Sequence, residues 1–198
     1  MDSQITSILL SVCVGLGIAA ATGFRIFLPM LIGNIASLMG WYHFSDSFSW
    51  MGSWTAFAIL SSATVAEIVA YYVPFLDNLL DKIALPLAVG AGTLISTSYM
   101  SDDMATPLKW GLGLIAGGGA AGLIHSAMGL LRLGSSAGTA GTANPIVTTG
   151  ENGAAATLSI LAFVIPVVIA ITVIVILVFV VKKLWRYFAG KDKKRNDP

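Results

Sequence analysis

The sequence predicts an all-α integral membrane protein, a bundle of about six transmembrane or half-membrane helices in which some segments can be re-entrant. Of the 198 residues, 56% are hydrophobic and only 11% are charged, whereas soluble domains carry about 25% charged residues. Residues 160–181 form an apolar stretch long enough to cross a hydrocarbon layer of roughly 30 Å. A basic cluster follows, because seven of the eleven Lys and Arg residues lie in the last seventeen positions.

The first forty residues contain more apolar chain than one span needs. Residues 5–40 are broken by Gly23 and Pro29, so they form two spans or a re-entrant pair of half-helices. The N-terminus lacks the basic residues of a signal peptide, so we expect its apolar segment to be retained. Cys13 is the only cysteine, which excludes an intramolecular disulfide and a Cys cluster for zinc. Further apolar segments cover residues 55–73 and 108–131 and, shorter than a span, residues 85–100.

Three segments between these spans have a different composition. Residues 40–54 are aromatic and polar, which suits a non-helical loop at the lipid headgroups. Residues 74–83 form a short amphipathic piece with Asp77 and Asp81 one turn apart. Residues 132–153 are rich in Gly, Ser and Thr, and two alternatives remain for them: an extracellular coil, or a re-entrant loop that lines a wet pocket.

The basic cluster predicts the orientation of the chain. Lys and Arg residues beside a span favour the cytoplasmic side, and an even number of crossings then places both termini there. We expect a single polytopic membrane domain at residues 1–188 and a basic cytoplasmic tail at residues 189–198. The cluster is an orientation signal, so the lipid bilayer is the expected partner and nucleic acid is not.

Helical spacing places small and polar residues on one face of the segment that begins at residue 108. They are Gly111, Gly118, Gly122, His125, Gly129 and Arg132, separated by 7, 4, 3, 4 and 3 positions. Glycines let another backbone approach closely, which predicts a packing seam within the bundle or in a homo-oligomer. His125 on this seam is either a hydrogen-bonded structural residue or a group that titrates near neutral pH.

Two more charged residues lie within apolar segments. Glu67 shares a helical stripe with Thr64 and Tyr71, and a carboxylate in hydrocarbon needs a partner, water or a proton. A structural ion pair is the alternative to proton exchange. Arg25 stays charged, so it can bind an anion or pair with Glu67 or Asp77. We therefore expect the charged residues to converge on one cavity.

These observations define a candidate site. Its predicted substrate-binding residues are Arg25, Arg132, Asn144 and Glu151, and its predicted proton-coupling residues are Glu67 and His125. No catalytic, metal or cofactor site is expected, because the sequence has no HExxH, P-loop or CxxC motif and its only histidines are His43 and His125. An enzyme is therefore the least favoured class.

Three stretches resemble a known family. They read "GLGIAAATGFRIFLPMLIG", "ATVAEIVAYYVPFLDNLLD" and "GLIHSAMGLLRLGSSAGTAGTANP", and Glu151 follows the third. They resemble the family called domain of unknown function 4126, small polytopic membrane proteins of bacteria with plant relatives. In that family an acid often stands at the place of Tyr71 or Tyr72, and another at the place of Asn152. The resemblance implies a bacterial inner-membrane protein and no particular reaction.

A second, fainter likeness concerns ten residues. The string "FRIFLPMLIG" is similar to the re-entrant arginine-proline motif of DedA-type proteins, which are associated with proton-coupled lipid-carrier translocation. We accordingly predict a proton-coupled secondary transporter or lipid translocator for a small anionic or amphiphilic substrate. The alternatives are a channel lined by the Gly/Ser/Thr loop and a non-transporting membrane scaffold subunit.

Overall fold

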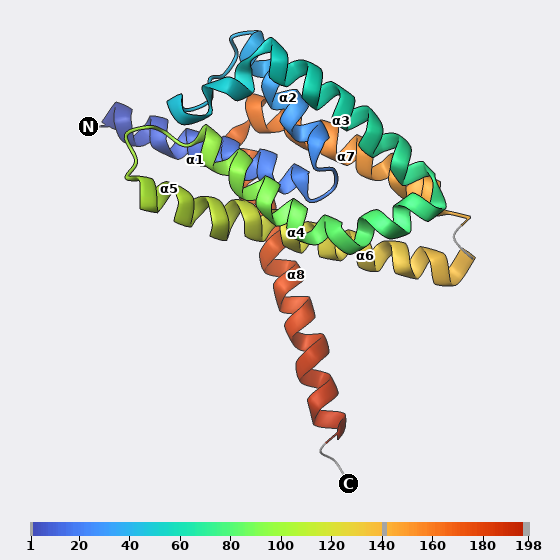
Figure 1. The fold of residues 1–198 in the computed structure, drawn as a ribbon. Coiled ribbons are helices and arrows are strands. Elements are labelled where there is room, and N and C mark those ends of the chain that lie inside the picture. Colours follow the sequence, from blue (N-terminus) through green and yellow to red (C-terminus); the bar gives the residue numbers. More distant parts are fainter. Residues whose placement is uncertain (1, 140–141, 196–198) are drawn as a thin grey trace.

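The protein folds into eight α-helices, a 3₁₀ helix and a π-helix in the part of the chain that the structure describes (Figure 1). This computed structural model describes residues 2–139 and 142–195, and side chains within them except at 2, 3, 74–79, 81, 82, 184 and 187–195. The elements are α1 Asp2–Thr22, α2 Phe27–Leu38, η1 Asp46–Gly52, α3 Trp54–Tyr72, α4 Pro74–Tyr99, α5 Thr106–Leu112, the π-helix η2 Gly113–Gly118, α6 Gly119–Thr139, α7 Asn144–Val164 and α8 Pro166–Arg195. The predicted all-α class is confirmed.

Four helices of the described chain are long and apolar enough to cross a membrane. They cover Gln4–Thr22, Trp54–Tyr72, Thr106–Thr139 and Pro166–Lys183, and shorter apolar helices cover Phe27–Leu38 and Ile83–Tyr99. The chain is therefore an integral membrane protein with both membrane-length and shorter apolar helices. The re-entrant arrangement, the side of each terminus and the division at residue 188 stay predictions.

Helix α1 is the centre of the bundle. It packs against α4, α6, α7 and α8, and its alanine-rich end from Ile18 to Thr22 has no exposed surface. Small residues make this burial possible, since a Cβ at Gly15 would lie 2.8 Å from the backbone oxygen of Ser96 on α4. The chain breaks after Thr22, as Gly23 predicted. Pro29 does not break it, because it falls in the first turn of α2, where no N–H is needed.

Helix α4 corrects one prediction. Residues 74–83 and 85–100 are not separate pieces, because Pro86 lies inside one continuous helix. The helix changes direction near its middle (Figure 1), as expected where a proline removes one backbone hydrogen bond without ending the helix. The side chains of Asp77 and Asp81 lie outside the described residues, so a pairing of Arg25 with Asp77 stays untested.

The glycine seam is present with a shifted register. Gly118, Gly122, His125 and Arg132 are buried as predicted, but the π-helix at Gly113–Gly118 changes the helical phase between Gly111 and Gly122. Gly113 and Gly117 consequently face α4, whereas Gly111 and Gly129 meet open space. The seam is used within the chain, and its use in a homo-oligomer stays a prediction.

Residues 132–153 are largely helical, which corrects the predicted coil or loop; that this segment re-enters the membrane stays a prediction. Helix α6 continues to Thr139 and α7 begins at Asn144. Hydroxyls of this segment bond to backbone carbonyls one turn earlier, for example Thr139 to Ser135 at 2.7 Å and Thr149 to Pro145 at 2.8 Å. Gly, Ser and Thr are common in membrane helices, so their abundance did not require a loop.

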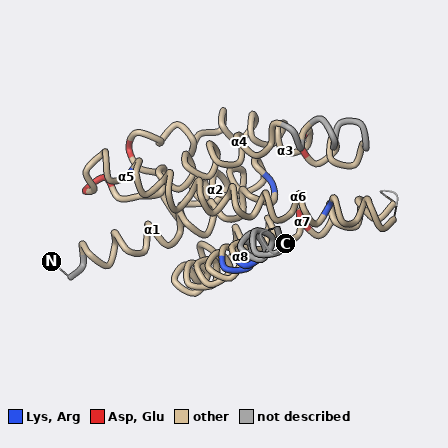
Figure 2. The backbone as a smooth tube through the Cα atoms, turned by 90° about the horizontal axis from the view of Figure 1, so that it is seen from below, with Lys and Arg blue, Asp and Glu red and all other residues tan. Residues whose placement is uncertain are grey.

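The last apolar stretch is also divided. Residues 160–181 do not form one helix, because α7 ends at Val164 and α8 begins at Pro166, where the proline disfavours helical backbone at Ile165. Helix α8 packs against the core through Ile169, Ala170 and Val173. It then extends out of the bundle, at a steep angle to the other helices (Figures 1 and 2). Most of its other described apolar side chains are exposed.

The segment after α2 is more ordered than the predicted loop. It contains η1, and the rings of Tyr42 and Phe44 pack on Tyr99 at centroid distances of 5.1 and 4.7 Å. Trp41 and Trp50 are exposed, which suits the predicted position at the headgroups.

Candidate functional site

Arg25 lies in the short connection between α1 and α2. The connection is buried because α6 approaches it closely: a Cβ at Gly23 would lie 2.7 Å from the backbone oxygen of Ala121 and from Cβ of Ile124. Only glycine permits this approach. The connection therefore turns inside the bundle and carries Arg25 inward, where the residue is 1% exposed.

Arg25 and Arg132 share the carboxylate of Glu151. Nη1 of Arg25 lies 2.8 Å from Oε2 of Glu151. Arg132 donates from Nε to Oε1 at 2.9 Å, and its Nη2 lies 2.5 Å from Oε2. The side chains of Arg25 and Glu151 have no exposed surface, and that of Arg132 is 5% exposed. We call these three residues the arginine–glutamate cluster; it holds two positive charges and one negative charge.

Arg25 also donates to other oxygens, of which the backbone oxygen of Phe24 accepts from Nη1 at 3.0 Å. Its Nε donates to Oδ1 of Asn152 at 2.6 Å, and its Nη2 to the backbone oxygen of Thr148 at 3.4 Å. The ring of Tyr71 from α3 lies against both guanidinium groups, with centroid distances of 4.0 Å to Arg25 and 4.6 Å to Arg132. Such stacking is a favourable cation–π arrangement when the groups are desolvated.

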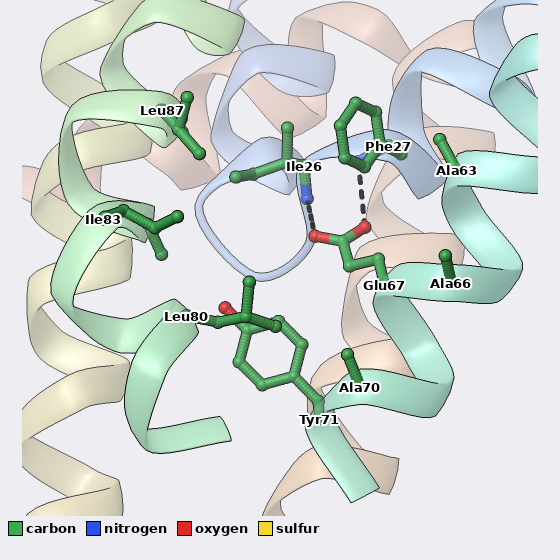
Figure 3. Close-up of a pocket in the computed structure, with 11 residues that line it drawn as sticks. Ile26, Phe27, Ala63, Ala66, Glu67, Ala70, Tyr71, Leu80, Ile83 and Leu87 are labelled. Atoms are coloured by element: carbon green, nitrogen blue, oxygen red, sulfur yellow. Dashed lines mark hydrogen bonds between the residues drawn. The ribbon is translucent and has the colours of Figure 1, made fainter. Parts of the chain in front are cut away.

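Glu67 binds the start of α2. Its carboxylate accepts the backbone N–H groups of Ile26 at 2.7 Å and Phe27 at 3.0 Å (Figure 3). These donors have no partner within the helix, and the positive end of the helix dipole favours a negative charge there. The structural alternative to proton exchange is therefore a helix cap rather than an ion pair.

The remaining predicted residues divide into two groups. His125 is 7% exposed, and its Nδ1 lies 3.3 Å from the backbone oxygen of Gly23. Arg25, Glu67 and His125 thus all meet the α1–α2 connection. Asn144 does not join them, because it bonds to Ser136 where α6 and α7 meet. The roles in substrate binding and proton coupling stay predictions.

An apolar groove separates α3 from α4. A pocket of about 400 Å³ is lined by α3 residues 63–71, α4 residues 80–87, Ile26 and Phe27. A second pocket, of about 430 Å³, shares Ile26, Phe27 and Leu87 with the first and reaches Met51 and Leu94. Figure 3 shows small alanines on the α3 side and larger aliphatic residues on the α4 side. Glu67 and Tyr71 are the polar residues of the first pocket. We call these two neighbouring pockets the α3–α4 groove.

The cluster is suited to an oxyanion rather than to a metal. No group of three or more His, Cys, Asp or Glu residues with metal-binding proximity occurs among the described residues. Two guanidinium groups carry ten N–H donors in planar arrays, which match carboxylate and phosphate oxygens. Glu151 now occupies that position from within the chain.

Sequence patterns identified some of this site and missed other parts. Tyr71 shared the predicted stripe with Glu67, but its contact with two arginines was not predicted, and neither was the bond of Asn152 to Arg25.

Residues 134–138 read GSSAG, which matches the G-x-S-x-G nucleophile pattern. They lie within continuous helix α6 rather than at a strand-to-helix turn. That the protein is no enzyme stays a prediction.

A comparison with known proteins gives one match. The family model described as Domain of unknown function (DUF4126) matches residues 12–186. No curated protein and no solved structure matches the chain. The matched range includes the whole arginine–glutamate cluster and the α3–α4 groove.

Proposed function

Because the chain belongs to the family described as Domain of unknown function (DUF4126), which names no reaction, we propose its function from the site: proton-coupled secondary transport of a small anionic or amphiphilic substrate. The observation that carries the proposal is the position of Glu151. A buried carboxylate between two arginines is the internal equivalent of a bound anion, and a substrate anion would compete with it for the same donors.

This competition provides the coupling. Two anions beside the same desolvated arginines repel each other, so Glu151 takes up a proton or turns away when the substrate binds. If it takes up a proton, the anion and the proton cross together. Glu67 and His125 are the predicted proton carriers on either side of the α1–α2 connection. The breaks at Gly23 and Pro166 provide places where helices can move relative to one another.

Transport in proteoliposomes tests the proposal. Phosphate, short carboxylates and alkyl phosphates are offered singly to vesicles that contain a pH-sensitive dye. We expect a pH gradient to drive accumulation of at least one anion in the native protein. Glu151→Gln should lose this accumulation but keep exchange of labelled for unlabelled anion, because exchange moves no net proton. Glu67→Gln tests the predicted carrier role of Glu67 in the same assay.

Several outcomes would overturn the proposal. One is that no anion enters protein-containing vesicles faster than it enters empty vesicles. Another is that pH-driven accumulation is the same in Glu151→Gln as in the native protein. Unitary current steps in planar bilayers would replace the transporter with a pore. Each variant is first checked by size-exclusion chromatography. Arg132→Met, which keeps the Arg25–Glu151 pair, tests whether transport needs the second arginine.

We further propose that the protein resides in a bacterial inner membrane with both termini in the cytoplasm. The support is the basic end of α8, with Lys182, Lys183 and Arg186 directly after the apolar stretch. Reporter fusions to each terminus test this orientation. A reporter that is active only outside the cytoplasm should stay inactive at both ends.

A further inference from the structure

We propose that the α3–α4 groove binds the apolar tail of an amphiphile whose anionic head group is held by Arg25 and Arg132. The inference rests on the proposed function and specifies its substrate class: a single hydrocarbon chain that ends in a carboxylate or a phosphate. Such a molecule would reach the site sideways from the bilayer rather than from water.

The groove has the size and the lining for a chain. Its two pockets, about 400 and 430 Å³, each lie within the range of ligand sites. Both are lined by Ile26, Phe27 and Leu87, so the two pockets lie next to each other. Ala63, Ala66 and Ala70 keep the α3 wall low (Figure 3). Small residues at this spacing normally let two helices touch. Beside these alanines α3 and α4 instead leave a groove, which indicates that a ligand fills it.

Tyr71 connects the groove to the arginines. One ring lines the first pocket and also lies 4.0 Å from the guanidinium carbon of Arg25 and 4.6 Å from that of Arg132. The polar end of the groove is thus one side chain away from two positive charges. Glu67 also lines this pocket, but its carboxylate is held by the N–H groups of Ile26 and Phe27. The two arginines therefore favour an anionic head group, which binds once the Tyr71 ring moves aside and Glu151 gives up the donors.

Photocrosslinking in lipid nanodiscs tests the tail. Three probes carry the same diazirine-labelled chain and end in phosphate, carboxylate or an uncharged hydroxyl. We expect the phosphate or the carboxylate probe to label residues 63–70 and 83–87, and their relative labelling identifies the head group. Ala66→Leu fills the groove and should reduce labelling about tenfold. Ala58→Leu makes the same change at an exposed position of α3 and should leave labelling within about twofold.

A second measurement separates this inference from the proposed function. Inorganic phosphate and acetate, which have no tail, are tested for thermal stabilisation of the native protein and of Arg132→Met. Stabilisation that needs Arg132, without groove labelling by any probe, would refute the tail site and leave anion transport intact.

Equal labelling by the hydroxyl probe, or labelling unchanged in Arg132→Met, would show ordinary bilayer lipid in the groove. A crosslink between two copies at the groove would replace the amphiphile with a dimer contact. Failure of all anions and charged probes would overturn both proposals.

Discussion

Arg25 and Glu151 form an ion pair at 2.8 Å in which neither side chain has any exposed surface. The pair joins the α1–α2 connection to α7, and Arg132 adds a second positive charge from α6. A buried charged group without ion-pair and hydrogen-bond partners is costly. Each group of the cluster therefore depends on the other two as partners. The cluster therefore makes the folding of three distant segments interdependent.

The first prediction concerns the unequal charge of the cluster. Glu151→Gln leaves two guanidinium groups facing a neutral amide and should lower the free energy of unfolding by about 3–5 kcal/mol. Arg132→Met leaves one arginine and one carboxylate and should cost less. Denaturation of the purified variants in detergent measures both values. Equal losses, or a larger loss for Arg132→Met, would contradict the account of Glu151 as the shared counter-ion.

The second prediction separates capping from proton exchange at Glu67. Glu67→Gln retains one oxygen acceptor for α2 and should lower stability by about 1 kcal/mol, whereas Glu67→Leu leaves two N–H groups without an acceptor and should cost about 2–3 kcal/mol. Unfolding in detergent gives these values. If pH-driven flux survives in Glu67→Gln, the residue is a cap alone. A Leu variant as stable as the native protein would remove the cap as well.

Local sequence predicted the membrane class and the unusual residues, but not their partners. Arg25 and Glu67 stood out because charge in an apolar segment is costly. The partner of Arg25 is Glu151, and only the packing of α7 against the α1–α2 connection brings them together. Glu67 found backbone donors rather than a charged residue, which no residue pattern specifies. The groove depends on the divergence of two helices, and sequence spacing carries no information about it.

Two prolines illustrate the same limit. Pro86 and Pro166 both interrupt apolar stretches, yet α4 continues through Pro86 whereas α7 ends just before Pro166. The local effect on the backbone is the same, because each removes one hydrogen bond. The packing of the two helices differs: α4 packs along α1 and the π-helix, whereas α8 packs in the bundle with its first turns and then leaves it.

The third prediction concerns acid. Asp102 follows α4, and its carboxylate accepts the N–H of Asp46 and the ammonium of Lys109, each at 2.9 Å. Partial burial raises the pKa of Asp102, but these two partners outweigh it and hold the pKa below the usual 3.8. A lowered pKa stabilises the fold above that value, and the contribution disappears as the pH falls through the folded-state pKa.

Asp102→Asn should therefore reduce stability at neutral pH, by less than about 1 kcal/mol because the carboxylate is nearly half exposed. Melting curves of the native protein and the variant should converge as the pH drops below about 4. Asp103→Asn controls for the loss of a neighbouring acid. A difference that persists unchanged at acidic pH would exclude the ionised carboxylate as its source.

The last prediction compares two glycines on one continuous helical stretch. A Cβ at Gly117 would lie 2.5 Å from the backbone oxygen of Gly92 and would also meet Ser96, whereas a Cβ at Gly129 would meet nothing within 4 Å. Gly117→Ala should force α4 away and cost about 1–3 kcal/mol. Gly129→Ala should be neutral or stabilise by up to about 1 kcal/mol, because alanine favours helix. Thermal unfolding of the two variants measures the contrast directly. If both are equally tolerated, the contact between α4 and η2 is looser than these distances require.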